Sequence, residues 1–170
     1  MKVFKTIMMA VVAMMFLTGP VLAADDKTAF LDLSRIFNDY GKTKDNDTVL
    51  EAAYNKYSGE RDAKVEKIKE AQGKLALLKA EEKDKVQKEI EQMTADLNQF
   101  DQTERTELTK QRDEKIREIL LEIEKIVSDY AKKEQISIVF NDRVLIYGNE
   151  SLDITEPILK VLNENYNKKE

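Results

Sequence analysis

Apolar residues recur at helical spacing through the middle of the chain, in two stripes that mirror each other. The members of the two stripes are Tyr57, Val65, Ile68, Leu75, Ile90, Leu97, Phe100 and Leu108. When the first four are paired with the last four from the outside inwards, the residue numbers of every pair have the same sum. Two antiparallel helices of a coiled coil produce this relation, because each step along one helix meets a step back along the other. The pattern predicts a helical hairpin with its turn near Glu82–Lys83.

The residues around the two stripes are also typical of helices. This part of the chain contains no proline, and Glu, Lys, Gln, Ala, Leu and Arg predominate, all good helix formers. Thr48 and Glu51 have the spacing of a capping box, and the polar segment 42–47 is expected to be a break before it. Residues 48–135 are therefore predicted to form a projecting arm with its tip near 80–85. Each helix of the arm would have about 45 residues and be about 65–70 Å long.

The end of the return helix carries a heptad seam of its own. Its members are Ile116, Ile119, Ile123, Ile126 and Tyr130, and the expected partners are Leu50, Ile36, Phe37 and Tyr40. Between Asp101 and Lys115 the seam almost disappears, because Leu108 is the only apolar residue there, expected to face Tyr57. Such a stretch either bends and opens or is a polar insert without a role, and both readings stay open.

The two ends of the chain have the alternation and turn residues of short strands. Residues 29–33 are expected to form a strand, and Ser34 to cap a short helix that follows it. Residues 136–140 and 144–147 are rich in β-branched and aromatic side chains, and Asn141-Asp142 between them is a tight-turn dipeptide. This second region is predicted to be a β-hairpin.

A small body is expected to form from residues 24–47 and 136–170, including a last helix capped by Thr155. These 59 residues make a marginal domain, because a domain near this size buries only about 60% of its surface. Three strands also leave two open edges, which a symmetric oligomer would close. The residues expected in the body core or in the oligomer interface are Leu31, Leu33, Ile136, Ile138, Phe140, Val144 and Ile146. The predicted fold class is α+β and mainly α, a long antiparallel helical hairpin on a small β-body.

The first residues have the features of a secretory signal peptide. Lys2 and Lys5 precede an uninterrupted apolar run from Ile7 to Leu17, and small residues precede a cleavage position after Ala23. The alternative is a retained membrane anchor, but a run of about 11 residues is too short to span about 30 Å of hydrocarbon. Residues 1–23 are therefore predicted to be removed, and the mature chain to be exported.

Composition narrows the chemistry of the mature chain. The absence of cysteine and histidine excludes disulfides, cysteine–histidine or serine–histidine catalysis, and the preferred zinc ligands. The glycines are isolated, so no glycine-rich phosphate loop is present. Without the leader the chain has 26 basic and 33 acidic residues, a net charge of −7, which argues against nucleic-acid binding. No cofactor, metal site or enzymatic activity is predicted, because the glutamates lie on solvated helix faces without an apolar pocket.

Four segments near the two ends carry a specific likeness: 28–40, 42–44, 138–148 and 152–155. They resemble the Skp/OmpH family of periplasmic chaperones, and the resemblance covers the whole mature chain. It implies a homotrimer in which strands from three subunits form one β-barrel and three helical arms surround a cavity. It further implies an ATP-independent holdase that binds unfolded outer-membrane proteins in the periplasm and prevents their aggregation. The type member is strongly basic and has been proposed to meet lipopolysaccharide and membrane surfaces. The acidic charge of this chain puts such contacts in doubt.

The hairpin also fits a structural coiled-coil scaffold of the cell envelope that binds a folded partner, and this alternative stays open. In the chaperone hypothesis, the inner faces of the arms contact clients through many weak apolar contacts. The candidate contact residues are Tyr54, Tyr57, Leu77, Leu78, Met93, Leu97, Phe100 and Leu108. Most of them have an alternative role in the hairpin seam. Leu77 and Leu78 are adjacent, so one helix face cannot bury both, and one of the two is expected to be exposed.

Overall fold

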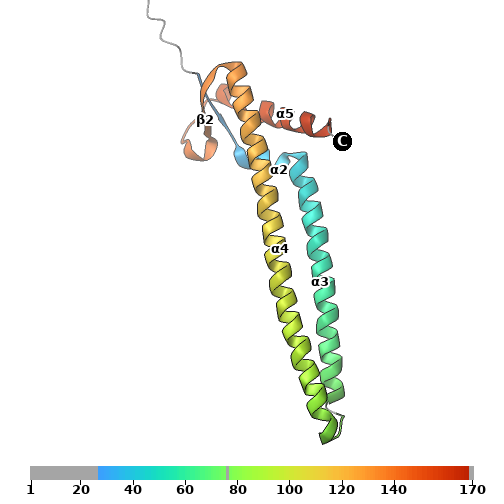
Figure 1. Cartoon of the computed structure of the whole chain (residues 1–170). Helices are drawn as coiled ribbons and strands as arrows, with labels where there is room; N and C mark the ends of the chain where they lie inside the picture. The colour runs from blue at the N-terminus through green and yellow to red at the C-terminus, as the bar shows by residue number, and fades with distance from the viewer. Residues whose placement is uncertain (1–26, 76, 169–170) are drawn as a thin grey trace, which may run out of the picture.

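Two long helices leave a small body and lie side by side along the arm (Figure 1). The computed structural model describes residues 27–75 and 77–168, so the predicted signal peptide lies outside the described residues. In chain order the elements are β1 (Lys27–Leu31), α2 (Leu33–Asp39), α3 (Gly41–Leu75), α4 (Ala80–Glu134), β2 (Ile136–Asn141), the 3₁₀ helices η1 (Asp142–Val144) and η2 (Glu150–Leu152), and α5 (Thr155–Asn167).

The two helices of the arm differ in length. α3 has 35 residues and α4 has 55, which correspond to about 50 and 80 Å. The prediction of two equal helices was therefore wrong, and so was the turn near Glu82–Lys83, because the turn lies between Leu75 and Ala80. α4 continues past the start of α3 and through the body (Figure 1). Charge favours this turn, since Lys74 lies in the last turn of α3 and two glutamates lie in the first turn of α4, where each complements the helix dipole.

The predicted break at 42–47 is also absent, because α3 begins at Gly41 and runs through this segment without interruption. Polar contacts to α4 replace apolar packing here. Lys42 Nζ donates to Glu118 and Glu122, and Lys115 Nζ donates to Asn46 Oδ1 at 3.1 Å. The polar segment 42–47 is therefore helical because side chains of α4 bind its side chains. These contacts could not be predicted from the local sequence pattern.

The sheet of the body has two strands within the described residues, and they are parallel. β1 and β2 pair from Lys27 with Ile136 to Leu31 with Asn141, so the helices between the strands form one long crossover. Gln135 turns the chain from α4 into β2 with a left-handed conformation, φ 58°. The other edge of β1 is covered by the segment before α5, where Ile154 N–H donates to the Phe30 carbonyl.

The predicted β-hairpin at 136–147 was wrong. Asn141 Oδ1 accepts from Arg143 N–H and starts η1, and residues 145–149 are irregular, not a returning strand. This segment passes close over β1, where a Cβ on Gly148 would lie 2.6 Å from the Phe30 ring. Because β2 pairs with the distant β1, the chain leaves β2 across the sheet and does not fold back along its own edge.

Two capping predictions also need correction. Asp32, not Ser34, caps α2, because its Oδ1 accepts from Arg35 N–H at 2.8 Å. Thr155 is the first residue of α5, and its side chain does not cap that helix. Its Oγ1 instead accepts from Asp32 N–H at 2.9 Å and donates to Asp153 Oδ1, so it ties α2 to α5. Arg35 also pairs with Glu156 across the same junction.

One hydrophobic core joins the body to the end of the arm. Its buried members are Ala29, Leu31, Ile36, Tyr40, Ile119, Ile123, Ile154, Ile158, Leu159 and Leu162. Ile36 and Tyr40, two of the partners predicted for the α4 heptad seam, share this cluster with Ile119 and Ile123, whereas Leu50, the partner predicted on α3, is not part of it. α5 contributes the inner face of a strongly amphipathic helix. The core thus depends on helices at least as much as on the small sheet.

Shortening Ile158 to alanine should destabilise the body strongly. Its side chain is fully buried in α5, so Ile158→Ala removes three carbons and leaves a cavity in the core. We expect the free energy of unfolding to fall by about 3 kcal/mol, measured by urea denaturation at one protein concentration. Val49→Ala is the matched control, because Val49 is 56% exposed on α3. Equal losses in the two variants would contradict the assigned core.

Candidate functional site

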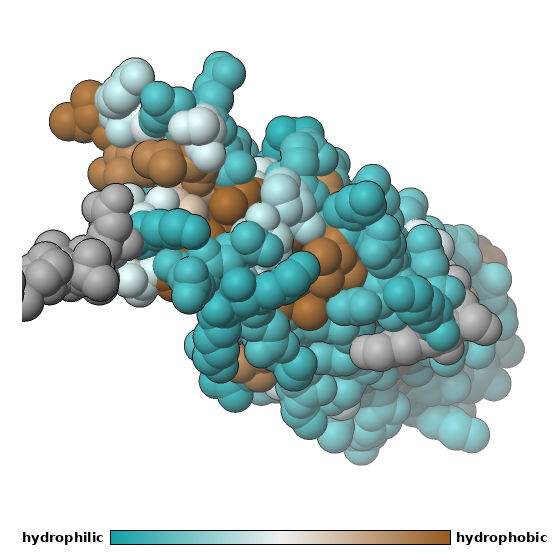
Figure 2. Space-filling view, turned by 90° about the horizontal axis from the view of Figure 1, so that it is seen from above, coloured by the Kyte–Doolittle hydropathy of each residue, from teal (hydrophilic) through white to brown (hydrophobic). Residues whose placement is uncertain are grey.

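The body exposes an apolar surface that a single chain does not cover. We define the body patch as Ile138, Phe140, Val144, Ile146 and Tyr147, which lie on β2 and in the segment after it. Val144 is 69% exposed, Tyr147 83%, and Ile146 is completely exposed. Viewed from above, hydrophobic surface gathers at one side of the body, whereas the arm behind it is mostly hydrophilic (Figure 2). Contiguous exposed apolar surface of this kind marks an interaction site.

An apolar groove lies beside this patch, between the sheet and α4. It has a volume of about 480 Å³, and its walls include Leu33, Leu120, Val127 and Phe140. Within the described residues, β2 pairs with β1 on one edge and with no other strand. The body thus offers an apolar groove, an exposed patch and an open strand edge together. All three features suit a protein partner better than a small polar ligand.

The predicted body residues divide into two groups. Leu31 is buried, and Leu33 and Ile136 are partly buried against the core. The other four, Ile138, Phe140, Val144 and Ile146, are exposed in the single chain and belong to the body patch. Their assignment to an oligomer interface stays a prediction.

Where the arm meets the body, charged groups fix the start of α3 against α4 and α5. Lys42 Nζ donates to Glu118 at 2.7 Å and to Glu122 at 2.9 Å. Burial acts to lower the pKa of Lys42, but these hydrogen bonds and charges raise it above its usual range. Tyr166 of α5 donates its hydroxyl to Asp45 at 2.7 Å. The arm therefore leaves the body in one orientation, set by polar contacts from both neighbouring helices.

Tyr40 lies in the same junction, and its ionisation should make the stability of the fold fall as the pH rises in the alkaline range. Burial, together with the carboxylate of Glu122, raises the pKa of Tyr40 from 10.0 to about 12. The folded state thus favours the neutral phenol, so this stabilisation is complete below pH 10 and is lost as the pH rises to about 12. We expect the free energy of unfolding to fall by about 2 kcal/mol over this interval. Urea unfolding at each pH measures it.

The variant Tyr40→Phe isolates this effect from the titration of other groups. It should lose that part of the pH dependence, whereas Tyr54→Phe, at a residue 58% exposed on α3, should retain it. A Tyr40→Phe protein with the same alkaline decline as the wild type would show that the phenol is not responsible.

In the middle of the arm, polar groups fill the weak part of the seam. The Tyr57 hydroxyl donates to Asp101 Oδ1 at 3.1 Å, and Arg61 Nε donates to Asp101 Oδ2 at 3.2 Å. Arg105 Nε donates to the Tyr57 hydroxyl at 3.1 Å, and the Tyr57 and Phe100 ring centroids are 5.8 Å apart. Tyr57 therefore packs one to two turns nearer the tip than its predicted partner Leu108. Whether this zone bends stays a prediction.

The candidate contact residues on the arm have different environments. Tyr54 is 58% exposed and Leu77, at the turn, 88% exposed, whereas Tyr57 is buried in the hairpin. The half-buried members are Leu78, Met93, Leu97, Phe100 and Leu108. Leu120 and Leu121 of α4 are also exposed and were missed, because their neighbours Ile119 and Ile123 suggested a buried seam. Their adjacency, like that of Leu77 and Leu78, was the available signal.

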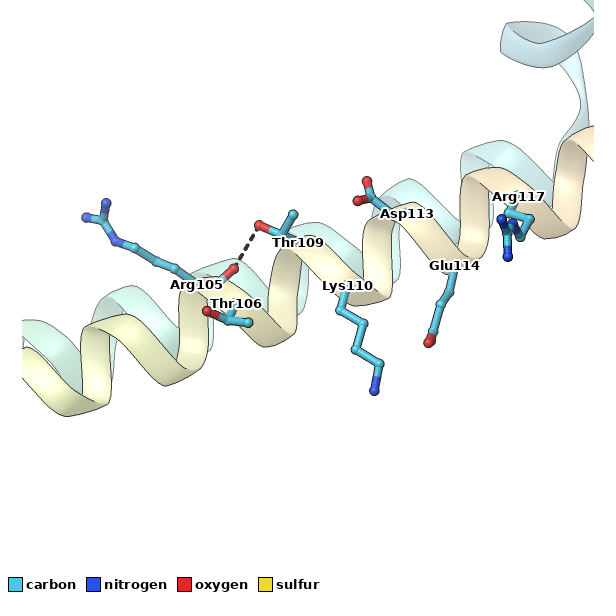
Figure 3. Close-up of a pocket in the computed structure, with 7 residues that line it drawn as sticks. All are labelled: Arg105, Thr106, Thr109, Lys110, Asp113, Glu114 and Arg117. Carbon is cyan, nitrogen blue, oxygen red and sulfur yellow. Dashed lines mark hydrogen bonds between the residues drawn. The ribbon is translucent and has the colours of Figure 1, made fainter.

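A hollow of about 670 Å³ follows α4 from Arg105 to Arg117 (Figure 3). Its side chains diverge: Arg105 and Asp113 leave the helix on one side, and Lys110 and Glu114 on the other (Figure 3). The only hydrogen bond drawn joins Thr109 to the Arg105 carbonyl and is internal to the helix. Mixed charges that point apart into solvent form no site for catalysis. Within residues 27–75 and 77–168, no cluster of acidic side chains could hold a metal ion.

A family model described as Outer membrane protein (OmpH-like) matches residues 27–162 of the sequence. The chain belongs to the OmpH-like family. The OmpH-like assignment agrees with the resemblance carried by the two ends of the chain, which is thereby confirmed. No curated protein gave a match to the sequence.

Structural comparison supports the same fold. A crystal structure from Caulobacter crescentus CB15, described as an OmpH-like outer membrane chaperone, superimposes with a TM-score of 0.76. The match covers 86% of this chain and 88% of that one at 12% sequence identity. The predicted fold class, a long helical hairpin on a small β-containing body, is therefore confirmed for this OmpH-like chain. At such low identity the likeness establishes the fold alone.

Proposed function

We propose that this protein is an ATP-independent chaperone that binds unfolded outer-membrane proteins in the periplasm and prevents their aggregation. The observation that carries the proposal is the arm, which projects about 50 Å from a body with an uncovered apolar patch. Family membership supports a chaperone, and the relative of known structure is described as one. The proposed activity requires neither catalytic residues nor a bound nucleotide.

The body patch supports assembly of several copies, and the proposed assembly is a homotrimer. Covering the patch and the open edge of β2 would join the small bodies into one core. Because each arm is rooted rigidly in its own body, joining the bodies also brings the arms together around a shared space. A client held in that space cannot pair its strands with those of another client.

Retention in this cavity would come from many weak contacts. Exposed apolar side chains on each arm contribute about 25 cal/mol per Å² of buried apolar surface before the cost of ordering is subtracted. Several arms in one assembly raise the effective concentration of these contacts, so that weak patches add up to firm retention. Release needs no ATP if folding into a membrane barrel is more favourable than remaining bound.

Localisation belongs to the same proposal. Cleavage after Ala23 would release the mature chain into the periplasm, where clients for the outer membrane pass. Within the described residues, no helix has an apolar stretch that could cross a membrane. Contact with lipopolysaccharide is not part of the proposal, because the mature charge is −7.

Two measurements on the mature protein test the proposal. Its mass in solution should be that of a trimer, and the trimer without ATP should suppress light scattering when a urea-unfolded outer-membrane barrel is diluted. A control protein of equal mass concentration should not suppress it. A folded monomer, or a trimer that leaves aggregation unchanged, would refute the chaperone. Pull-down of one folded partner in fixed stoichiometry would instead favour the scaffold.

A further inference from the structure

A second hollow opens between α3 and α4 near the middle of the arm, at the weak part of the seam. Its volume is about 450 Å³, and it is lined by Tyr54, Tyr57, Arg105, Leu108, Thr109 and Arg112. We call it the arm hollow. It lies where the apolar seam is interrupted: the Tyr57 ring packs near Phe100 and its hydroxyl donates to Asp101, while Leu108 is half-buried beside the hollow.

Three of the six residues that line the arm hollow are aromatic or aliphatic: Tyr54, Tyr57 and Leu108. The Tyr54 and Tyr57 rings meet edge to face, with centroids 6.0 Å apart and planes inclined by 62°. Tyr54 is 58% exposed, while Tyr57 is held in place by hydrogen bonds with Asp101 and Arg105. Leu108 is half-buried at the same place. A ring entering the hollow would thus meet the exposed Tyr54 ring and the Leu108 side chain, the kind of apolar surroundings that aromatic side chains prefer.

The two charged residues that line the arm hollow are both arginines, although Asp101 and Asp113 lie next to it, in contact with Tyr57 and Arg112. Arg105 and Arg112 are its only charged lining residues, in a chain with more acidic than basic residues. The hydrogen bond to Tyr57 orients the Arg105 guanidinium, and Arg112 forms an ion pair with its exposed neighbour Asp113 at 3.2 Å. The hollow in Figure 3 differs, since its lining includes both signs. Two arginines beside an aromatic hollow complement a carboxylate that accompanies a ring.

We propose that the arm hollow binds an aromatic side chain of an unfolded client segment that carries an acidic side chain two residues away. In an extended chain, residues i and i+2 lie on the same side, so the ring and the carboxylate would reach the hollow and its arginines together. A folded protein offers such a pair less readily, because its aromatic residues are packed inside. This inference rests on the proposed chaperone function and adds a sequence preference to it.

Short peptides test the preference directly. A soluble peptide with one Phe-Ser-Asp core is compared with Phe-Ser-Asn and Ala-Ser-Asp versions of the same length. Each is titrated into the full mature protein while the methyl signals of Leu108 are followed by NMR. The Phe-Ser-Asp peptide should shift these signals at the lowest concentration. Loss of the carboxylate should weaken binding about threefold, and loss of the ring about tenfold.

Two variants connect this preference to the arm hollow. Arg112→Gln should reduce the difference between the Asp and Asn peptides, because Arg105 alone remains, and Tyr54→Ala should weaken every Phe peptide about tenfold. Lys110→Gln removes a charge from the other side of α4, and Val49→Ala removes exposed apolar surface elsewhere on α3, so both should bind like the wild type. All four positions are exposed, so the variants should keep the fold, which the unchanged far-UV spectrum would verify.

Each outcome supports or overturns the site. Equal binding of the three peptides, or equal effects of Arg112→Gln and Lys110→Gln, would overturn it while leaving a chaperone that still suppresses aggregation. The site would also be overturned if the Leu108 methyl signals moved with protein concentration in the absence of peptide, because a second copy of the chain would then occupy the hollow. Selective peptide binding without suppression of aggregation would keep the site and refute the proposed function.

Discussion

Aspartate at both Ile146 and Tyr147 should separate the assembly into folded monomers. Both side chains lie almost entirely in solvent in the single chain, so charges there cost the folded monomer little. In an assembly that covers the body patch, each carboxylate would be buried against apolar surface without a partner, at a cost of several kcal/mol. We expect the subunits to associate at least about a thousandfold more weakly, as measured by sedimentation or light-scattering mass.

Leu77→Asp is the control for this double variant, because Leu77 is 88% exposed at the far end of the arm. It should leave the mass unchanged. The separated monomers should retain the helical spectrum of the wild type but no longer suppress client aggregation, since single arms enclose no space. A double variant of full assembly mass would show that the body patch is not the interface.

Removing the outer half of the arm should abolish suppression of aggregation and leave the base intact. Residues 65–99 can be replaced by a short glycine-rich turn, because Lys64 and Phe100 already lie across from each other, with Lys64 Nζ 5.0 Å from the ring centroid. The remaining parts of α3 and α4 keep the core of the body and the contacts of the arm root. We expect a folded oligomer with no measurable effect on the scattering of a diluted, unfolded barrel protein.

The matched control replaces residues 77–79 with the same linker and keeps both helices at full length. It should act like the wild type, which separates the length of the arm from the chemistry of its turn. Undiminished suppression by the shortened protein would show that the outer arm does not hold clients. The shortened protein keeps Tyr54, Arg105 and Arg112, so it should still prefer the Phe-Ser-Asp peptide, and this result tests the arm hollow independently of retention.

Periodicity predicted the hairpin correctly because a coiled coil depends on the spacing of apolar residues a few positions apart in the sequence. The stripes on either side of the turn needed only the repeat of an α-helix and the rule that antiparallel helices pair in reverse order. The same spacing marked Ile119 and Ile123, and the structure places both in the core. The position of the turn was missed by several residues, because contact partners such as Tyr57 and Phe100 are chosen by side-chain geometry and not by spacing alone.

The strands of the body were harder to predict for a different reason. Residues 136–147 have the local composition of a hairpin, but β2 pairs in parallel with β1, more than a hundred residues earlier. That pairing becomes available only after the arm has folded back and brought the two ends together. Residues 42–47 show the same effect, since their helix depends on partners such as Glu118 and Glu122 in α4.

The exposed residues also fall into two groups: those whose exposure can be predicted from neighbouring residues and those whose exposure depends on the fold. Leu77, next to Leu78 in the sequence, could be suspected of exposure, since adjacent apolar residues cannot share one face. Four of the five body-patch residues were expected in the body core or interface, but their exposure in the single chain was not decided by spacing. The arm hollow could not be foreseen, because it is formed by α3 and α4, which meet only in the folded chain. Local spacing along the chain therefore decided the helices, the hairpin and the apolar faces, since these depend on neighbours a few residues apart. Only the packed structure decided the strand pairing, the place of the turn and the surfaces left open, because these depend on contacts between residues far apart in sequence.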